Sequence, residues 1–202
     1  MKYQLRDYQK KASDAAVMCF KMKSGRNGLL VLPTGAGKSL IIADIAARLE
    51  EPLIVFQPNK EILEQNFAKL QTYGIWDCSI YSASVGRKEI SRITFATIGS
   101  VIRHMKDFQH FKNILIDECH LVKPSDGMYK RFFEQAERRI VGLTATPYRL
   151  YSCMNGSMLK FLTRTRPRVF SQVLYYCQVS ELLAKGFLSR LKYYDVTRID
   201  LT

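Results

Sequence analysis

The 202-residue sequence has no run of the roughly 20 apolar residues that a membrane span needs, and its first residues lack the apolar core of a signal peptide. Cysteine is sparse. The five cysteines have no C-x-x-C spacing and are odd in number, which indicates neither a disulfide framework nor a zinc site. Repeats and low-complexity tracts are also missing. We therefore expect a cytoplasmic or nucleoid-associated protein with reduced thiols and no membrane partner.

Acidic residues are few, with 18 Asp and Glu against 31 Lys and Arg, and the formal net charge is +13. The excess continues from Tyr151 to the C-terminus, where eight basic and three acidic residues give a net charge of +5. Such an excess favours a polyanionic partner such as DNA or RNA. A charge that serves solubility alone is the alternative at this point.

Apolar residues make up 47% of the chain, enough for one substantial α/β core. Short apolar runs alternate with helix-period segments. This alternation predicts a mostly parallel, doubly wound sheet with helices on both faces. The expected strands are 29–32, 53–56, 75–82, 92–96, 113–116, 140–144, 173–177 and 191–196, and the expected helices are 4–23, 38–50, a segment bearing Ile62 to Leu70, 129–138 and 180–185.

The segment from Gly28 to Ser39 is the one around which the chain is organised. A buried strand runs into a Gly-rich turn, and Lys38 and Ser39 then open an apolar-periodic helix. This layout is typical of a phosphate-binding loop. Its glycines let backbone N–H groups surround an anion, the lysine neutralises terminal phosphates, and the hydroxyl can bind Mg²⁺. Leu32 stands where the strict pattern has Gly, so a chance Gly-Lys-Ser is the alternative, which the strand-turn-helix context disfavours.

A second informative stretch is the apolar strand that ends in Asp117 and Glu118. Buried carboxylates are costly unless they are paired or bind a metal, and the carboxyl ends of α/β strands are where ligands bind. We expect Asp117 to face the Mg²⁺ held by Ser39, and Glu118 to orient and deprotonate the water that attacks the γ-phosphate. A plain acidic turn at the end of a strand is the alternative.

Two further positions carry polar groups near the expected site. Gln9 has the donor and the acceptor needed to read an adenine edge, although by spacing alone it is an ordinary solvated helix residue. The strand 140–144 ends in the hydroxyls of Thr144 and Thr146, which can link the nucleotide site to another ligand.

A series of ordered stretches resembles the motifs of superfamily-2 helicases and translocases of the DEAD/DEAH-box type. Residues 5–9 resemble the adenine-sensing Q element, 33–39 motif I, 57–65 motif Ia, 97–100 motifs Ib and Ic, Asp117-Glu118-Cys119-His120 the DExH motif II, and 144–146 motif III. The resemblance covers about residues 1 to 150. It implies a RecA-like P-loop NTPase fold and hydrolysis of ATP, with Mg²⁺, coupled to movement along DNA or RNA.

The resemblance also implies residue roles. The catalytic residues would be Glu118, Asp117 and Lys38, and Ser39 and Asp117 would bind the metal. ATP would be bound by Gln9, Thr34, Gly35, Ala36, Gly37, Lys38 and Ser39. The nucleotide would be coupled to the nucleic acid by His120, Thr144 and Thr146. The nucleic-acid backbone would be contacted by Pro58, Asn59, Thr97 and Ser100.

For the domain organisation, we expect one ATP-binding domain over 1–196, with a Q-motif helix region at 1–25 and a basic extension at 151–196. Residues 197–202 would begin a linker. Nothing after residue 150 resembles the Arg-rich motif VI, so we expect the second RecA-like lobe to lie outside this chain. We favour DNA as the substrate, although the sequence does not decide between DNA and RNA. A binding module without turnover is the main alternative, and an unrelated P-loop kinase fits less well.

Overall fold

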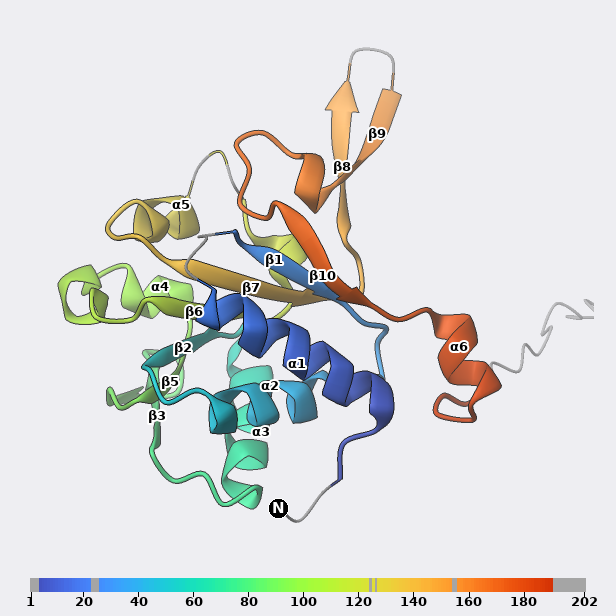
Figure 1. The fold of residues 1–202 in the computed structure, drawn as a ribbon. Helices are drawn as coiled ribbons and strands as arrows, with labels where there is room; N and C mark the ends of the chain where they lie inside the picture. Colours follow the sequence, from blue (N-terminus) through green and yellow to red (C-terminus); the bar gives the residue numbers. More distant parts are fainter. Residues whose placement is uncertain (1–3, 23–25, 124, 126, 154–155, 191–202) are drawn as a thin grey trace, which may run out of the picture.

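The computed structural model describes residues 4–22, 26–123, 125, 127–153 and 156–190. Its centre is an eight-stranded sheet in the order β10-β1-β7-β6-β2-β5-β3-β4, and a two-stranded sheet, β8-β9, projects from it (Figure 1). The helices and strands are α1 (Asp7–Lys21), β1 (Gly28–Val31), α2 (Lys38–Arg48), β2 (Leu53–Phe56), α3 (Lys60–Thr72), β3 (Cys78–Ser82), β4 (Arg87–Lys88), β5 (Ile93–Ala96), α4 (Ile98–Val101), η1 (Met105–Phe108), β6 (Asn113–Ile116), η2 (Cys119–Leu121), α5 (Met128–Phe133), β7 (Arg139–Thr144), β8 (Tyr148–Cys153), β9 (Gly156–Phe161), η3 (Leu162–Arg164), β10 (Gln172–Tyr176) and α6 (Val179–Ala184).

The large sheet is parallel except for β4, which pairs antiparallel with β3 at one edge. Parallel strands are covered on both faces and read as continuous apolar runs. The strands β2, β5 and β6 follow this rule, since every residue in them is buried. The predicted mostly parallel α/β sheet is confirmed.

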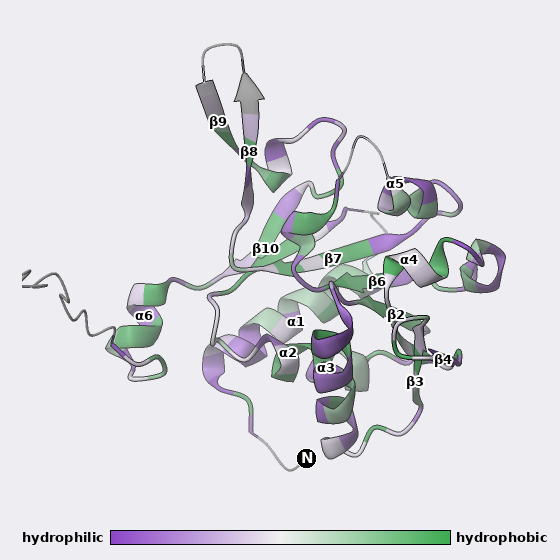
Figure 2. Ribbon diagram, turned by 180° about the vertical axis from the view of Figure 1, so that it is seen from behind, coloured by the Kyte–Doolittle hydropathy of each residue, from purple (hydrophilic) through white to green (hydrophobic). Residues whose placement is uncertain are grey.

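Two apolar cores lie on the two sides of this sheet. Helices α1, α2 and α3 cover one face, and α4, η1 and α5 cover the other. Successive strand residues point to opposite faces, so Leu30 packs with the first group of helices while Leu29 packs with the second. Figure 2 shows the middle strands in hydrophobic colours. No helix in the described part of the chain has the length and apolar character needed to cross a membrane.

Several expected boundaries were wrong by a few residues. Helix α1 covers 7–21 rather than 4–23, α2 ends at Arg48, and the strand expected from residue 75 begins at Cys78. The largest error is α5, which ends at Phe133 rather than near 138 because the chain has to turn before it enters β7 at Arg139. The strand expected at 191–196 and the linker at 197–202 lie outside the described residues.

The β8-β9 hairpin was missed by the sequence analysis. It pairs residues 148–153 with 156–161, and every residue of β9 is exposed. The basic extension expected from residue 151 therefore begins inside a hairpin. The Asn155-Gly156 pair in the sequence is a known hairpin signal, and it could have revealed this element.

Candidate functional site

Three neighbouring parallel strands bring the expected motifs together. In the sheet, β7 lies between β1 and β6, and all three run in the same direction. Their carboxyl ends lead into the Gly-rich loop 33–37, the Thr144-Ala145-Thr146 segment and the Asp117-Glu118 pair, respectively. Because the carboxyl ends of parallel strands share one edge of the sheet, segments about 80 and 110 residues apart in the chain become neighbours.

The Gly-rich loop has the backbone of an anion cradle. Gly35 and Gly37 have φ of 81° and 75°, in the left-handed region that favours glycine. A Cβ on Gly37 would lie 2.5 Å from Nε2 of Gln9, so the site also has no space for a side chain there. Helix α2 starts at Lys38, and the first N–H groups of a helix have no partner within it. The loop and helix start thus fit a polyphosphate.

Helix α1 is hydrogen-bonded to this loop. The Oη of Tyr8 and the Nε2 of Gln9 both donate to the carbonyl of Ala36, each at 2.9 Å. The Oε1 of Gln9 accepts from the backbone N–H of Arg6, and the Gln9 side chain is buried. Gln9 therefore has a positioning role for the loop that the sequence did not reveal. Tyr8 belongs to the predicted apolar side of the helix, and its hydrogen bond to the loop was not predicted.

Lys38 and Glu118 form an ion pair, with Nζ and Oε1 3.2 Å apart. Glu118 has φ of 46°, and among the described residues it is the only non-glycine residue with a positive φ. A left-handed conformation costs a residue with a side chain about 1 to 2 kcal/mol. The surrounding turn therefore holds Glu118 against a local preference, which is common at functional sites.

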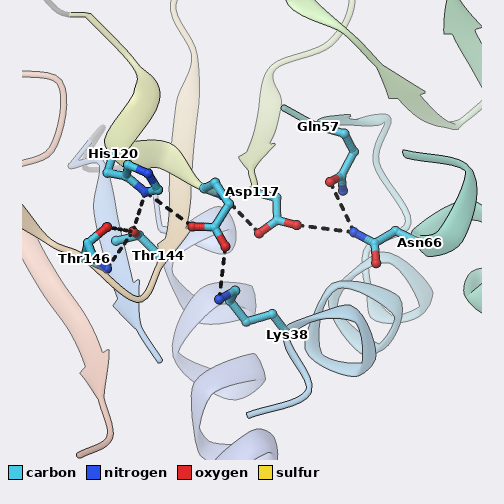
Figure 3. A network of polar contacts seen from close by, with 8 residues as sticks. Lys38, Gln57, Asn66, Asp117, His120, Thr144 and Thr146 are labelled. Atoms are coloured by element: carbon cyan, nitrogen blue, oxygen red, sulfur yellow. Dashed lines mark hydrogen bonds and ion pairs between the residues drawn. The ribbon is translucent and has the colours of Figure 1, made fainter. Parts of the chain in front are cut away.

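His120 joins this pair to the end of β7. Its Nδ1 lies 3.0 Å from Oγ1 of Thr144 and 3.3 Å from Oε2 of Glu118. Oγ1 of Thr144 also accepts from the backbone N–H of Thr146 at 3.0 Å (Figure 3). The backbone carbonyl of His120 in turn accepts from the Arg149 guanidinium at the base of the β8-β9 hairpin, a contact that the sequence gave no reason to expect. The three residues expected to couple two ligands are thus in one network.

Asp117 ends the buried strand and is itself buried. Burial raises the pKa of this carboxyl from 3.8 to about 6, the charge of Glu118 adds to the rise, and Lys38, the N–H of Glu118 and Asn66 oppose it. Asn66 donates from Nδ2 to Oδ2 of Asp117 at 3.3 Å and to Oε1 of Gln57 at 3.1 Å. The sequence analysis missed Asn66, although a polar residue on the apolar stripe of α3 is a signal in itself.

We predict that Asp117→Asn stabilises the protein in the absence of Mg²⁺. A raised pKa means that ionisation is unfavourable in the fold, so the contribution of Asp117 is best below its ordinary pKa of 3.8 and is lost as the pH rises through about 6. The shift corresponds to at most about 3 kcal/mol of unfolding free energy. Urea unfolding at about pH 7.5 and about pH 4.5 should show a gain for the variant that shrinks at the lower pH. The exposed Asp107→Asn is the matched control, and an equal gain at both pH values contradicts the prediction.

The residues expected to touch nucleic acid follow β2 and β5, which are adjacent strands. Pro58 and Thr97 line a pocket of about 500 Å³. Asn59 caps α3, since its Oδ1 accepts from the N–H of Ile62 at 2.9 Å. Ser100 is buried, and its Oγ accepts from the N–H of Ala83 at 2.8 Å. Pro58 and Thr97 therefore line a pocket, while the side chains of Thr97, Asn59 and Ser100 all have hydrogen bonds within the protein.

The metal-binding capacity of the site is small. Within the described ranges, no group of three or more His, Cys, Asp and Glu side chains could hold a metal ion. Mg²⁺ is commonly bound by one or two protein oxygens together with substrate phosphates and water. The Ser39 hydroxyl and the Asp117 carboxylate are oxygen ligands of that kind, and their binding of Mg²⁺ stays a prediction.

Sequence comparison places these motifs in a known family. Residues 2–149 match the family described as "Type III restriction enzyme, res subunit". The chain is 29% identical over 151 residues to the "DNA 3'-5' translocase XPB2" of Sulfurisphaera tokodaii, which covers 73% of the chain and 32% of that protein. It is also 29% identical over 154 residues to the "DNA 3'-5' helicase XPB" of Mycobacterium tuberculosis, covering 71% of the chain and 27% of the relative. The chain thus spans about a third or less of the length of these relatives.

Solved structures show the same fold. The UvsW helicase from bacteriophage T4 matches with a TM-score of 0.57 at 22% identity, over 72% of this chain and 54% of the other. The Sulfolobus solfataricus SWI2/SNF2 ATPase core, solved in complex with dsDNA, matches with a TM-score of 0.57 at 22% identity, over 73% of this chain and 33% of the other. The matching motifs and the shared fold lead to one assignment. The chain belongs to the family of the type III restriction enzyme res subunit, and it has the RecA-like fold of the helicase and ATPase structures that it matches.

Proposed function

We propose that this chain is the ATP-binding lobe of a helicase or translocase that acts on nucleic acid, and that DNA is its substrate. The observation that carries the proposal is the convergence of a phosphate cradle, the Lys38–Glu118 pair and the His120–Thr144 contact at one edge of the sheet. Two relatives named as a DNA translocase and a DNA helicase share 29% of their residues with the matched part of the chain.

In this proposal the triphosphate of ATP lies on the loop formed by Thr34, Gly35, Ala36 and Gly37, with Lys38 at the terminal phosphates. Ser39 and Asp117 hold Mg²⁺, whose charge offsets that of the phosphates. The amide of Gln9 contacts adenine. It uses one N–H and one lone pair within the protein, which leaves one of each for a ligand.

Hydrolysis then depends on Glu118. In the structure its carboxylate faces Lys38, and a bound γ-phosphate would compete for the same cation. Once Lys38 turns to the phosphates, Glu118 is free to orient a water molecule and accept its proton. His120 contacts both Glu118 and Thr144. A change in the position of Glu118 can therefore shift His120 and, through it, Thr144 and Thr146 at the end of β7.

Nucleic acid would bind at the ends of β2 and β5. Pro58 and Thr97 line the pocket there, and Asn59 and Ser100 shape its surroundings. The net charge of +13 favours binding of the phosphate backbone. Movement along DNA further requires a second RecA-like lobe, for which this chain supplies one side of the nucleotide site.

The variant Lys38→Ala tests the nucleotide site. It removes the cation beside the phosphates, so we expect ATP affinity to fall at least tenfold, or by about 1.4 kcal/mol. Titration calorimetry with Mg²⁺ measures the change. Lys130→Ala, which removes an exposed cation from α5, is the control and should bind ATP like the wild type. A folded Lys38→Ala variant with unchanged affinity would refute the assignment.

A further inference from the structure

Three buried polar side chains are hydrogen-bonded in series beside the proposed metal site. They are the carboxylate of Asp117 directly after β6, the amide of Asn66 in the middle of α3 and the amide of Gln57 directly after β2. All three side chains are buried, with exposed fractions of 6%, 5% and 1%. Figure 3 shows Asn66 joined by dashed lines to both Asp117 and Gln57. Nothing in the ATP site as described requires the two amides, so their presence in an otherwise apolar layer calls for an explanation.

The hydrogen bonds fix the direction of each amide. The two N–H groups of Asn66 are both used, one on Oδ2 of Asp117 at 3.3 Å and one on Oε1 of Gln57 at 3.1 Å. The Oε1 of Gln57 is thereby held toward Asn66. The reverse orientation of Gln57 would place two donors against each other. Asn66 therefore bonds correctly to Asp117 and Gln57 together only when Gln57 has this one orientation.

The far end of this series is Nε2 of Gln57. In this orientation it is buried and has no hydrogen-bond acceptor among the described residues. A buried donor without an acceptor is costly, and such groups are rare in proteins. Gln57 also lines the pocket that holds Pro58 and Thr97. An acceptor that enters this pocket could take the free N–H and hold Gln57 in place.

The pocket favours an acceptor from nucleic acid. Exposed Leu121 and Met128 and the exposed Lys123 line its mouth, so it offers apolar contact together with one cation. Sugar and phosphate oxygens are acceptors with adjacent negative charge, which the cation of Lys123 favours over a neutral carbonyl. The basic character of the whole chain points the same way.

We propose that Gln57 and Asn66 are positioning residues that couple the occupation of this pocket by a nucleic-acid backbone to the orientation of Asp117. The inference rests on the proposed function. A backbone oxygen that accepts from Nε2 fixes Gln57, which fixes Asn66, which fixes Oδ2 of Asp117. These hydrogen bonds end at Asp117, the proposed metal ligand. They are separate from the His120–Thr144 contact, which is next to Glu118.

The test is a coupling measurement on the 202-residue chain. The affinity for a non-hydrolysable ATP analogue in the presence of Mg²⁺ is measured with and without a saturating oligonucleotide of mixed sequence. The ratio of the two affinities is the coupling. In the wild type we expect the oligonucleotide to tighten nucleotide binding by roughly 5- to 150-fold, the usual range of coupling between two sites. In Asn66→Ala and in Gln57→Met the ratio of affinities with and without oligonucleotide should fall at least threefold toward one. The double variant should lose no more of this coupling than either single variant, as expected for two residues that act along the same path.

Controls separate coupling from stability. Gln57→Met keeps the size of the side chain and leaves α3 intact, so it tests the relay even if Asn66→Ala does not fold. Gln71→Ala removes an amide from the end of the same helix and should keep the wild-type ratio. A wild-type chain that does not bind the oligonucleotide overturns the proposed function and the relay together. If both ligands bind and the single variants keep the wild-type ratio, the relay alone is wrong.

Discussion

ATP turnover by this chain is expected to rise by roughly 10³ to 10⁵ when a second RecA-like lobe with an arginine facing the γ-phosphate is joined to it. Charge grows on the phosphoryl oxygens in the transition state, and a cation has to meet it there. Among the described residues, Lys38 is the only lysine or arginine paired with Glu118 or Asp117. It already binds the ground-state phosphates in our proposal, and uniform binding of this kind does not raise kcat.

The measurement compares kcat and ATP affinity for the chain alone, for the two-lobe protein and for a two-lobe protein whose arginine is replaced by Ala. The affinity should change much less than kcat, and the third protein should behave like the single lobe. A single lobe that turned over at several per second, within the ordinary range for enzymes of about 1 to 10³ per second, would contradict this picture.

Glu118→Gln in the two-lobe protein is expected to lower kcat by roughly 10² to 10⁴, the usual contribution of a general base. Gln has the same shape but cannot accept the proton from water. Nucleotide binding should be retained or become tighter, because the variant lacks the carboxylate that pairs with Lys38 at 3.2 Å. Single-turnover hydrolysis and calorimetry measure the two effects separately.

Glu134→Gln is the matched control. Glu134 is exposed, and its ion-pair partner is Lys130 rather than Lys38. It should leave both quantities unchanged. A Glu118→Gln protein with normal kcat would show that another group activates the water. A loss of ATP binding in parallel with kcat would indicate damage to the loop instead.

The sequence was most informative where one short segment carries its own chemistry. The run from Gly28 to Ser39 contains its strand, its turn glycines and its helix start, so the loop could be predicted without knowledge of any other part of the chain. The same holds for the strand that ends in Asp117. The strands β2, β5 and β6 were also predictable, because burial on both faces leaves an unbroken apolar run.

The relations that were missed depend on elements far apart in the chain. The distance between Asn66 and Asp117 depends on how α3 packs on the sheet, and no local pattern encodes it. The burial of Gln9 against Ala36 is similar, since its helix alone suggests a solvated residue. The β8-β9 hairpin was missed for another reason: most of its apolar residues are exposed, so they do not follow the alternation that marks a half-buried strand.

The burial of the strands on both faces also bears on how the sheet selects its register. A slip by one residue would exchange apolar side chains between two apolar layers, so hydrophobicity alone penalises it little. Polar groups at the start of the strands can discriminate. Asn27 accepts from the N–H of Ile140 at 2.8 Å, and the buried Asn113 donates to Glu51 at 2.9 Å. Gly142 adds a steric criterion, since a Cβ there would lie 2.6 Å from Sγ of Cys119. The strand register that assembles the nucleotide site is thus favoured by polar contacts at the opposite ends of the strands and by the lack of space for a side chain at Gly142.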